Sequence, residues 1–315
     1  MTFRVFLAFL LILSSFAAAA EKPVPQVKHA LIISADGLRP DLMLRANAPR
    51  MRAMLERASF SLWARTTPAS ITLPSHVSMF TGVNPEAHGI MWNGELPLKE
   101  PIYPNFPTIF ELAKQAQLST ALIAGKAKFD VFDRPGVLDW KFFASTSEAS
   151  DKEVIDDALQ VIRDHQPDLM VVHFALIDVV GHAKGWGSPE QMAAIAQTDQ
   201  SIGALLDLLD EMKLSDSTFI ILTADHGGHG RTHGPEDPRS RTIPWIASGP
   251  GIRKNFDLTL LGSDSQIETY DTFTTTCTML GIPIQRKVKG KFIPQILENP
   301  ELITTRPSPA TQQAR

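Results

Sequence analysis

The sequence predicts an α/β fold of the doubly wound type, in which helices cover both faces of a mostly parallel central sheet. Short apolar runs alternate along the chain with longer segments that repeat apolar residues at helical spacing. Several of the apolar runs end abruptly at Asp or His, as buried parallel strands often do at a ligand site. A hydrophobic content of 43% with 20% charged residues is enough to bury a substantial core. Parallel strands need crossover helices, so the alternation favours a single α/β domain, which we assign to residues 30–298.

The two ends of the chain differ from this domain. The first twenty residues, MTFRVFLAFLLILSSFAAAA, combine one Arg, an apolar run and small residues, which is typical of a secretory signal peptide cleaved after Ala20. The apolar run is shorter than the ~20 residues that a membrane span needs, although an uncleaved anchor is the alternative. We therefore expect export to the periplasm or secretion, with no stable membrane span after processing. Residues 21–29 are interpreted as a linker and residues 299–315 as a flexible tail.

Charge and cysteine content exclude two classes of interaction. The formal net charge is −4, and loss of one Arg with residues 1–20 would make it −5. A mildly acidic protein is a poor electrostatic partner for a nucleic-acid duplex. Cys277 is the single cysteine, so no internal disulfide forms, and we interpret it as a small buried hydrophobe.

The secondary structure is predicted from the period of the apolar residues. Helices are expected at 48–58, from Thr72 onward, and at 107–117, 152–165, 188–213 and 266–280. Strands are expected at 30–34, 120–124, 169–176, 219–223 and 243–247. Ser188 and Pro189 suit the cap and first position of the long helix. Residues 130–150 are expected to be irregular.

The stretch from Pro68 to Gly89 indicates a polar turn that runs into a helix, because Pro74 suits a first helical turn. A hydroxyl at such a start faces free backbone N–H groups, which together can bind a phosphate. The Thr72 hydroxyl is a candidate nucleophile, but it needs a base or a metal to activate it. Taken alone, Thr72 is more simply an ordinary helix cap.

Carboxylate and imidazole side chains follow three of the expected strands. Asp36 follows the first strand, Asp178 and His182 follow residues 169–176, and Asp225 and His226 follow residues 219–223. Since ligands bind outside the carboxyl ends of parallel strands, we expect these side chains to converge, joined by His233 from the next loop. Each of these motifs alone would be an ordinary turn, and their joint occurrence favours a functional site. Imidazole nitrogen and carboxylate oxygen suit zinc, with manganese the less favoured ion.

Six or seven ligands are too many for one tetrahedral ion and suit two Zn²⁺ ions, which together can clamp the attacking and leaving oxygens of an in-line displacement. The expected ligand sets are Asp36, Asp225, His226 and the Thr72 oxygen for one ion, and Asp178, His182 and His233 for the other.

Six motifs also carry a family resemblance: SADGLRPD, ITLPSHVSMFTG, EAHGIMWN, IDVVGHAKG, TADHGGHG and RTHG, in this order over residues 29–290. The series resembles the alkaline phosphatase superfamily, and within it the nucleotide pyrophosphatase/phosphodiesterase branch. The resemblance implies the two-zinc site with these ligand sets, and a covalent phosphoenzyme on Thr72. It also matches Asn93 to a side chain that donates a hydrogen bond to a phosphate oxygen. The sulfatase branch is disfavoured, since its Cys/Ser-x-Pro-x-Arg setting is absent.

The last metal ligand has an alternative. His229 and His233 both lie in the loop after Asp225 and His226. His233 is followed by Gly234 and fits the family's His-Gly better, whereas His229 remains the second choice.

Lys126 and Lys128, in AGKAKFD, are candidate substrate-binding residues. Their placement is similar to that of a basic pair in some monoesterase and phosphonoacetate-hydrolase members of the superfamily. A monoester carries more negative charge at the reacting phosphoryl group than a diester, so additional fixed cations stabilise it more. The alternative is that both are ordinary surface lysines.

The expected function is that of an exported two-zinc hydrolase of phosphate esters, with phosphodiesters and nucleotide pyrophosphates as the favoured small-molecule substrates. The alternative within this class is a phosphomonoesterase or phosphonate hydrolase that uses Lys126 and Lys128. Two other classes are a catalytically inactive metal- or phosphate-binding protein and a plain doubly wound domain without metal. The sequence does not indicate the oligomeric state.

Overall fold

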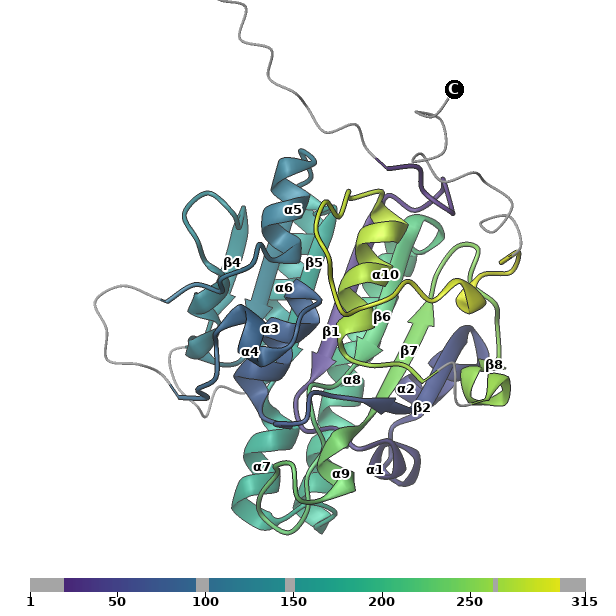
Figure 1. The fold of residues 1–315 in the computed structure, drawn as a ribbon. Helices are drawn as coiled ribbons and strands as arrows, with labels where there is room; N and C mark the ends of the chain where they lie inside the picture. The colour runs from purple at the N-terminus through teal and green to yellow at the C-terminus, as the bar shows by residue number, and fades with distance from the viewer. Residues whose placement is uncertain (1–19, 95–101, 145–150, 263–265, 301–315) are drawn as a thin grey trace, which may run out of the picture.

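The computed structural model describes residues 20–94, 102–144, 151–262 and 266–300 (Figure 1). Apart from Ala20, the expected signal peptide lies outside the described residues, as does the expected tail from residue 301 onward. In the part that is described, no helix combines the length and the apolar character needed to cross a membrane.

The strands form one sheet in the order β4-β3-β5-β1-β6-β7-β2-β8. Their bounds are β1 (His29–Ala35), β2 (Ala58–Arg65), β3 (Thr120–Ala124), β4 (Trp140–Phe143), β5 (Leu169–Phe174), β6 (Thr218–Thr223), β7 (Thr242–Ser248) and β8 (Phe256–Asp257). The first five strands in this sheet order, β4, β3, β5, β1 and β6, pair in parallel with their neighbours. Strand β7 runs antiparallel to both β6 and β2. The expected mostly parallel sheet is confirmed.

Helices cover both faces of the sheet (Figure 1). Helices α3, α5 and α10 pack together on one face, and α2, α6 and α8 pack together on the other. The bounds are α1 (Pro40–Arg45), α2 (Pro49–Glu56), α3 (Thr72–Thr81), α4 (Pro85–His88), α5 (Ile109–Gln115), α6 (Asp151–His165), α7 (Leu176–Lys184), α8 (Pro189–Glu211), α9 (Pro238–Arg241) and α10 (Tyr270–Leu280). Ser188 caps α8 by accepting from the Gln191 N–H, as its sequence predicts.

The core lies between these layers. Strands β5 and β6 are buried along their whole length, and β1 is buried after its first residue. Trp245, Phe80 and Phe273 are among the largest fully buried side chains, and each contributes roughly 1.5–3 kcal/mol of hydrophobic free energy. Cys277 is buried, as expected. The resulting rigid sheet fixes where its carboxyl edge places the side chains that follow.

Three predictions of secondary structure need correction. The strand expected at 169–176 ends at Phe174, and the chain turns at once into α7, so Asp178 lies within a helix. Strand β2 was not predicted, although the alternation of Ser with Phe and Leu in it is itself a strand pattern. Strand β4 lies in the stretch expected to be irregular, because it is a short, half-buried edge strand without an apolar run.

Asp151 ties α6, α7 and α8 together and so positions α7. Its Oδ1 accepts from the backbone N–H groups of Ala175 and Leu176 at 3.0 and 3.1 Å, and its Oδ2 accepts from the Thr198 hydroxyl at 2.6 Å. The carboxylate thereby satisfies N–H groups at the start of α7 that have no partner within that helix. Burial, only partly offset by these hydrogen bonds, raises the pKa of Asp151 to about 6.

We predict that Asp151→Asn changes the pH dependence of stability. Because the folded state binds the Asp151 proton more tightly than the unfolded chain, this carboxyl favours folding most below about pH 4, and that contribution is lost as the pH rises to about 6. The asparagine does not titrate, so the variant should gain up to about 3 kcal/mol relative to the wild type between pH 4 and 7. Urea unfolding with a chelator present at several pH values measures this, with exposed Asp216→Asn as the control. Parallel pH profiles for wild type and Asp151→Asn would contradict it.

Candidate active site

Adjacent strands bring two carboxylates together. Strands β1 and β6 pair in parallel with Ser34 opposite Thr223, so the residues that follow, Asp36 and Asp225, leave the sheet side by side. Both carboxylates are fully buried. The Gly37 N–H donates to Asp225 Oδ1 at 3.2 Å, and Gly37 has a φ of 74°, a conformation that suits glycine.

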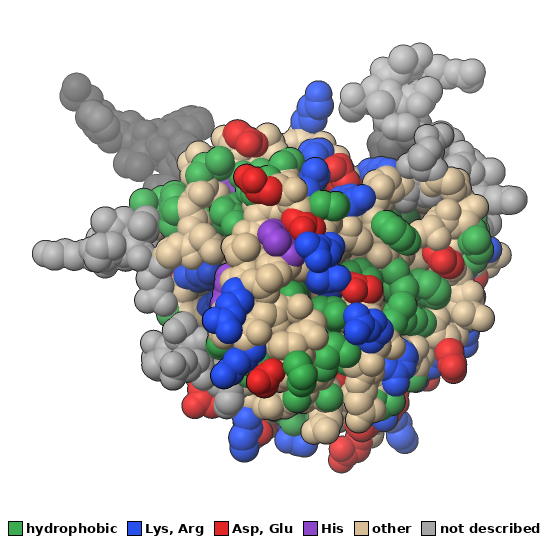
Figure 2. All heavy atoms as spheres, turned by 90° about the horizontal axis from the view of Figure 1, so that it is seen from below, with side chains coloured by type: hydrophobic (Ala, Val, Ile, Leu, Met, Phe, Trp, Pro, Cys, Tyr) green, Lys and Arg blue, Asp and Glu red, His purple; other side chains and the backbone are tan. Residues whose placement is uncertain are grey.

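Helix α7 contributes the third carboxylate. Asp178 and His182 are one turn apart, so they lie on the same face of the helix. His182 Nε2 is 3.4 Å from Asp178 Oδ1. Figure 2 views this end of the molecule and shows histidine beside basic and acidic side chains.

Three imidazoles direct their Nε2 atoms toward these carboxylates. In each ring, Nδ1 lies within hydrogen-bond distance of a backbone carbonyl. The contacts are His182 to Arg231 at 3.0 Å, His226 to Gly227 at 2.7 Å and His233 to Ser70 at 2.8 Å. A carbonyl oxygen only accepts hydrogen bonds, so Nδ1 carries the proton and Nε2 of the neutral ring keeps its lone pair. This is the usual arrangement of a histidine that binds a metal through Nε2.

Burial sets the charge of these rings. It lowers the pKa of His226 to about 3, assisted by the neighbouring His233, and it also lowers the pKa of His233. Both rings are therefore neutral near pH 7. The half-buried His182 differs, because its interaction with the nearby carboxylate of Asp178 raises its pKa.

The facing oxygens are buried and unpaired. Among the described residues, Asp36 Oδ1, Asp178 Oδ1 and Asp225 Oδ2 have no hydrogen-bond partner. His226 Nε2 lies 3.3 Å from both Asp36 Oδ1 and Asp225 Oδ2, and His233 Nε2 lies 3.8 Å from Asp178 Oδ1. Imidazole lone pairs and carboxylate oxygens repel one another in a buried site unless a cation lies between them. The donor set therefore fits divalent cations of the zinc type.

The ligand atoms fall into two groups that share Asp178. One group is Asp178, His182 and His233, and the other is Asp36, Asp178 and His226. The first matches a ligand set expected from the sequence. In the second, Asp178 lies with Asp36 and His226, and Asp225 lies against His226. Asp178 is thus placed between the two groups, whereas the sequence assigned it to one ion.

Thr72 opens α3 beside this cluster. Its Oγ1 is 3.2 Å from His226 Nε2. His76 holds the start of α3, with Nδ1 2.9 Å from the Thr72 carbonyl and Nε2 2.8 Å from Ser34 Oγ. Thr72 lines a hollow of about 480 Å³ together with Asn93, Lys128 and His233. The hydroxyl is therefore next to the candidate metal ligands, and Thr72 lies at the edge of a hollow that can hold a small molecule.

Asn93 and Lys128 meet at the same hollow. Asn93 Oδ1 accepts from the Leu73 N–H at 2.9 Å and from Lys128 Nζ at 3.0 Å. These two donors fix the amide orientation, so the Asn93 Nδ2 group remains as a donor. Burial, reinforced by the charge of Lys126, lowers the pKa of Lys128 to about 8.

Lys126 lines the same hollow, but its ammonium group is paired with carboxylates. It is buried, and its Nζ donates to Asp36 Oδ2 and to Asp178 Oδ2, both at 2.6 Å. Burial opposes its charge, but the two carboxylates outweigh burial and raise the pKa of Lys126 above its usual range. The same ammonium, with a hydrogen bond from His173, holds the pKa of Asp36 well below its usual range despite burial.

Of the two candidates for the last ligand, His233 joins the cluster. His229 Nδ1 instead lies 3.2 Å from Ser240 Oγ. His173 was interpreted as a structural histidine and was not predicted to be part of the site, but its Nε2 is 3.0 Å from Asp36 Oδ2. The sequence feature that could have identified His173 is a single imidazole within an otherwise apolar buried strand.

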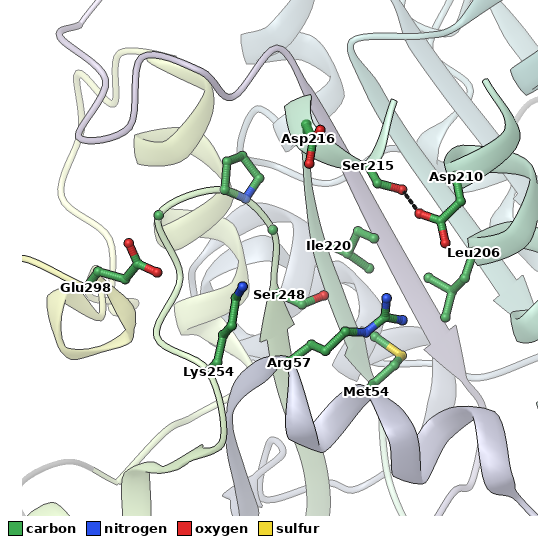
Figure 3. Close-up of a pocket in the computed structure, with 13 residues that line it drawn as sticks. Met54, Arg57, Leu206, Asp210, Ser215, Asp216, Ile220, Ser248, Lys254 and Glu298 are labelled. Carbon is green, nitrogen blue, oxygen red and sulfur yellow. Dashed lines mark hydrogen bonds between the residues drawn. The ribbon is translucent and has the colours of Figure 1, made fainter. Parts of the chain in front are cut away.

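A second hollow of about 250 Å³ lies at the opposite edge of the sheet, near the start of β6 and the end of β7 (Figure 3). Arg57, Lys254 and Glu298 line it, and Ser215 bonds to Asp210. Its carboxylates are not among the groups of described residues that could hold a metal. Both groups of described residues that could hold a metal lie at the carboxyl edge instead.

Solved structures share this fold. Murine ectonucleotide pyrophosphatase/phosphodiesterase 5 superposes with a TM-score of 0.69 at 14% identity, covering 86% of this chain and 100% of that chain. An inactive threonine-to-alanine variant of that protein in complex with AMP gives a TM-score of 0.67 at 14% identity over 83% and 97% of the two chains. A 2-O GAG sulfatase gives 0.69 at 15% identity over 86% and 74%.

Curated relatives are more similar in sequence. An uncharacterized pyrophosphatase/phosphodiesterase of Schizosaccharomyces pombe is 28% identical over 214 residues, 62% of this chain and 44% of the relative. Ectonucleotide pyrophosphatase/phosphodiesterase family member 7 of Mus musculus is 23% identical over 237 residues, 67% of this chain and 52% of the relative. The chain thus spans about half the length of the curated relatives it matches.

Family models give the assignment. Residues 189–281 match the sulfatase model, whose family shares the fold. Residues 30–233, more than half of the chain, match the model of type I phosphodiesterases and nucleotide pyrophosphatases. This range carries Thr72, Asn93 and the carboxylates and imidazoles of the cluster, and the resemblance to the alkaline phosphatase superfamily is confirmed. The protein therefore belongs to the type I phosphodiesterase / nucleotide pyrophosphatase family.

Proposed function

We propose that the protein hydrolyses phosphate esters with two zinc ions and a covalent phosphothreonine intermediate on Thr72, and that phosphodiesters and nucleotide pyrophosphates are its favoured substrates. The observation that carries the proposal is the convergence of unpaired carboxylate oxygens and imidazole Nε2 atoms beside the Thr72 hydroxyl. Bound zinc would supply positive charge that lowers the pKa of the hydroxyl and stabilises the oxygens of the displacement.

The chain's own residues position the reacting groups. The Thr72 hydroxyl releases its proton to solvent and its oxygen attacks phosphorus in line; a P–O bond to Thr72 forms, the P–O bond to the leaving group breaks, and the leaving oxygen gains a proton from solvent. Water then attacks phosphothreonine, its oxygen bonds to phosphorus, the bond from phosphorus to Thr72 Oγ1 breaks, and one proton of the water passes to Thr72. Asn93 Nδ2 would donate to a non-bridging phosphate oxygen, and Lys128 would add positive charge at the same hollow, which both residues line.

Two observations favour nucleotide-like diesters. The family match is to phosphodiesterases and nucleotide pyrophosphatases, and a structural neighbour binds AMP, the kind of group that such a cleavage releases. In addition, one of the two lysines that a monoesterase or phosphonate hydrolase would use is already paired with Asp36 and Asp178. That alternative keeps Lys128 as its remaining cation. We further propose that residues 1–20 direct export and are removed.

Replacement of the nucleophile should separate catalysis from metal binding. Thr72→Ala removes the hydroxyl but none of the carboxylates or imidazoles, so turnover should fall by at least about 10³-fold while the zinc content stays unchanged. Thr72→Ser is the matched variant and should keep a measurable fraction of the activity. Steady-state rates and metal analysis on the same preparations test this. An undiminished rate in Thr72→Ala would show that the nucleophile is elsewhere.

The two loop histidines should differ in metal binding. His233→Ala removes an imidazole of the Asp178 group, so the variant should retain about one zinc fewer per chain after dialysis. His229→Ala changes a ring that bonds to Ser240 outside the groups, and its zinc content should equal that of the wild type. Mass-spectrometric metal analysis compares them. The opposite pattern would make His229 the ligand.

A substrate profile ranks the ester classes. Bis-p-nitrophenyl phosphate should be cleaved faster than p-nitrophenyl phosphate, a chelator should abolish both activities, and added zinc should restore them. Initial rates with and without chelator provide the measurement, repeated with Lys128→Ala. A strong monoester preference that collapses in Lys128→Ala would replace the diesterase assignment with the monoesterase one. Chelator-resistant turnover would argue against the metal.

A further inference from the structure

We propose that Lys126 is a positioning residue: its ammonium group orients Asp36 and Asp178 so that one oxygen of each carboxylate is presented to the metal ions. This inference rests on the proposed metal centre and assigns Lys126 a role in metal binding in place of substrate binding.

The two oxygens of each carboxylate have different surroundings. Lys126 Nζ lies 2.6 Å from Oδ2 of Asp36 and 2.6 Å from Oδ2 of Asp178. His173 Nε2 donates to the same Oδ2 of Asp36 at 3.0 Å. The Oδ1 atoms of both carboxylates have no partner among the described residues and face the imidazole Nε2 atoms. One oxygen of each carboxylate is thus held by the protein, and the other points toward the candidate ions.

A single ammonium couples the two groups of ligands. Asp36 belongs to one group, and Asp178 belongs to both. Rotation of either carboxylate about its Cβ–Cγ bond would exchange the two oxygens, and it would break a short charge-assisted hydrogen bond to Lys126. The residue therefore fixes the orientation of both carboxylates at once, as conserved partners of metal ligands do in other metal sites.

The ammonium of Lys126 has little capacity left for substrate. It carries three donors, and two of them are used by Asp36 and Asp178. The Lys126 side chain is also only 11% exposed. Lys128 is the contrasting case, since its Nζ contacts Asn93 O and Oδ1 at 3.0 Å and, in the described part of the chain, forms no ion pair with a carboxylate.

This contrast provides a matched pair of variants. Lys126→Met and Lys128→Met each remove one ammonium from the same hollow and keep most of the aliphatic side chain. The zinc affinity of each variant is measured by competition with a chromophoric chelator. We expect Lys126→Met to bind zinc about 10–100-fold more weakly than the wild type, and Lys128→Met to stay within about threefold.

A kinetic readout separates orientation from a general loss of structure. With zinc in large excess, Lys126→Met should recover kcat, and its KM for bis-p-nitrophenyl phosphate should stay within about threefold of the wild type. Lys128→Met should keep a raised KM at every zinc concentration. Lys126→Gln is measured in parallel. The zinc affinity is taken only from a Lys126 variant whose circular dichroism spectrum matches that of the wild type.

Several results would overturn the proposal. Zinc affinity in the folded Lys126 variants equal to or higher than that of the wild type would show that the ammonium does not organise the ligands. A raised KM that excess zinc does not correct would assign Lys126 to substrate binding. Failure of the proposed function is distinguishable, because in that case the wild-type protein itself would bind no zinc.

Discussion

Repulsion among three buried carboxylates is the constraint on which the site depends. Asp36, Asp178 and Asp225 are withdrawn from water at one edge of the sheet, and Lys126 is the cation that pairs with two of them. Burial and the charge of Asp36 raise the pKa of Asp225 well above its usual range, which shows how costly the third charge is. Without cations, the electrostatic free energy of such a cluster of buried carboxylates is unfavourable. Divalent cations between the carboxylates would offset this repulsion, so the same geometry suits a metal-binding site.

The surrounding fold fixes the positions of these charged side chains. The register of β1 and β6 sets Asp36 against Asp225, and Asp151 holds the start of the helix that carries Asp178. Backbone carbonyls select the tautomer of each imidazole. Side chains locked in this way lose little further conformational entropy on binding, and the nearby Thr72 hydroxyl is placed by the first turn of α3.

Much of this arrangement could be predicted from local patterns. Apolar runs predicted β1, β5 and β6, and the rule that parallel strands end at one edge then brought Asp36 and Asp225 together. Strands β2 and β4 lack such runs. The pairing of Lys126 with Asp36 joins residues 90 positions apart, and no periodicity encodes that contact. The helical position of Asp178 depends on a cap from Asp151, which is equally non-local.

The most direct test of the account is a crystal structure of the zinc-loaded protein with anomalous scattering measured at the zinc edge. Two anomalous peaks should appear, one within about 2.0–2.2 Å of ligand atoms of Asp36 and His226, and one at that distance from His182 and His233. Lys126 should still contact Oδ2 of both Asp36 and Asp178. Absence of zinc peaks from this cluster, with the carboxylates and imidazoles in the same positions, would contradict the central claim.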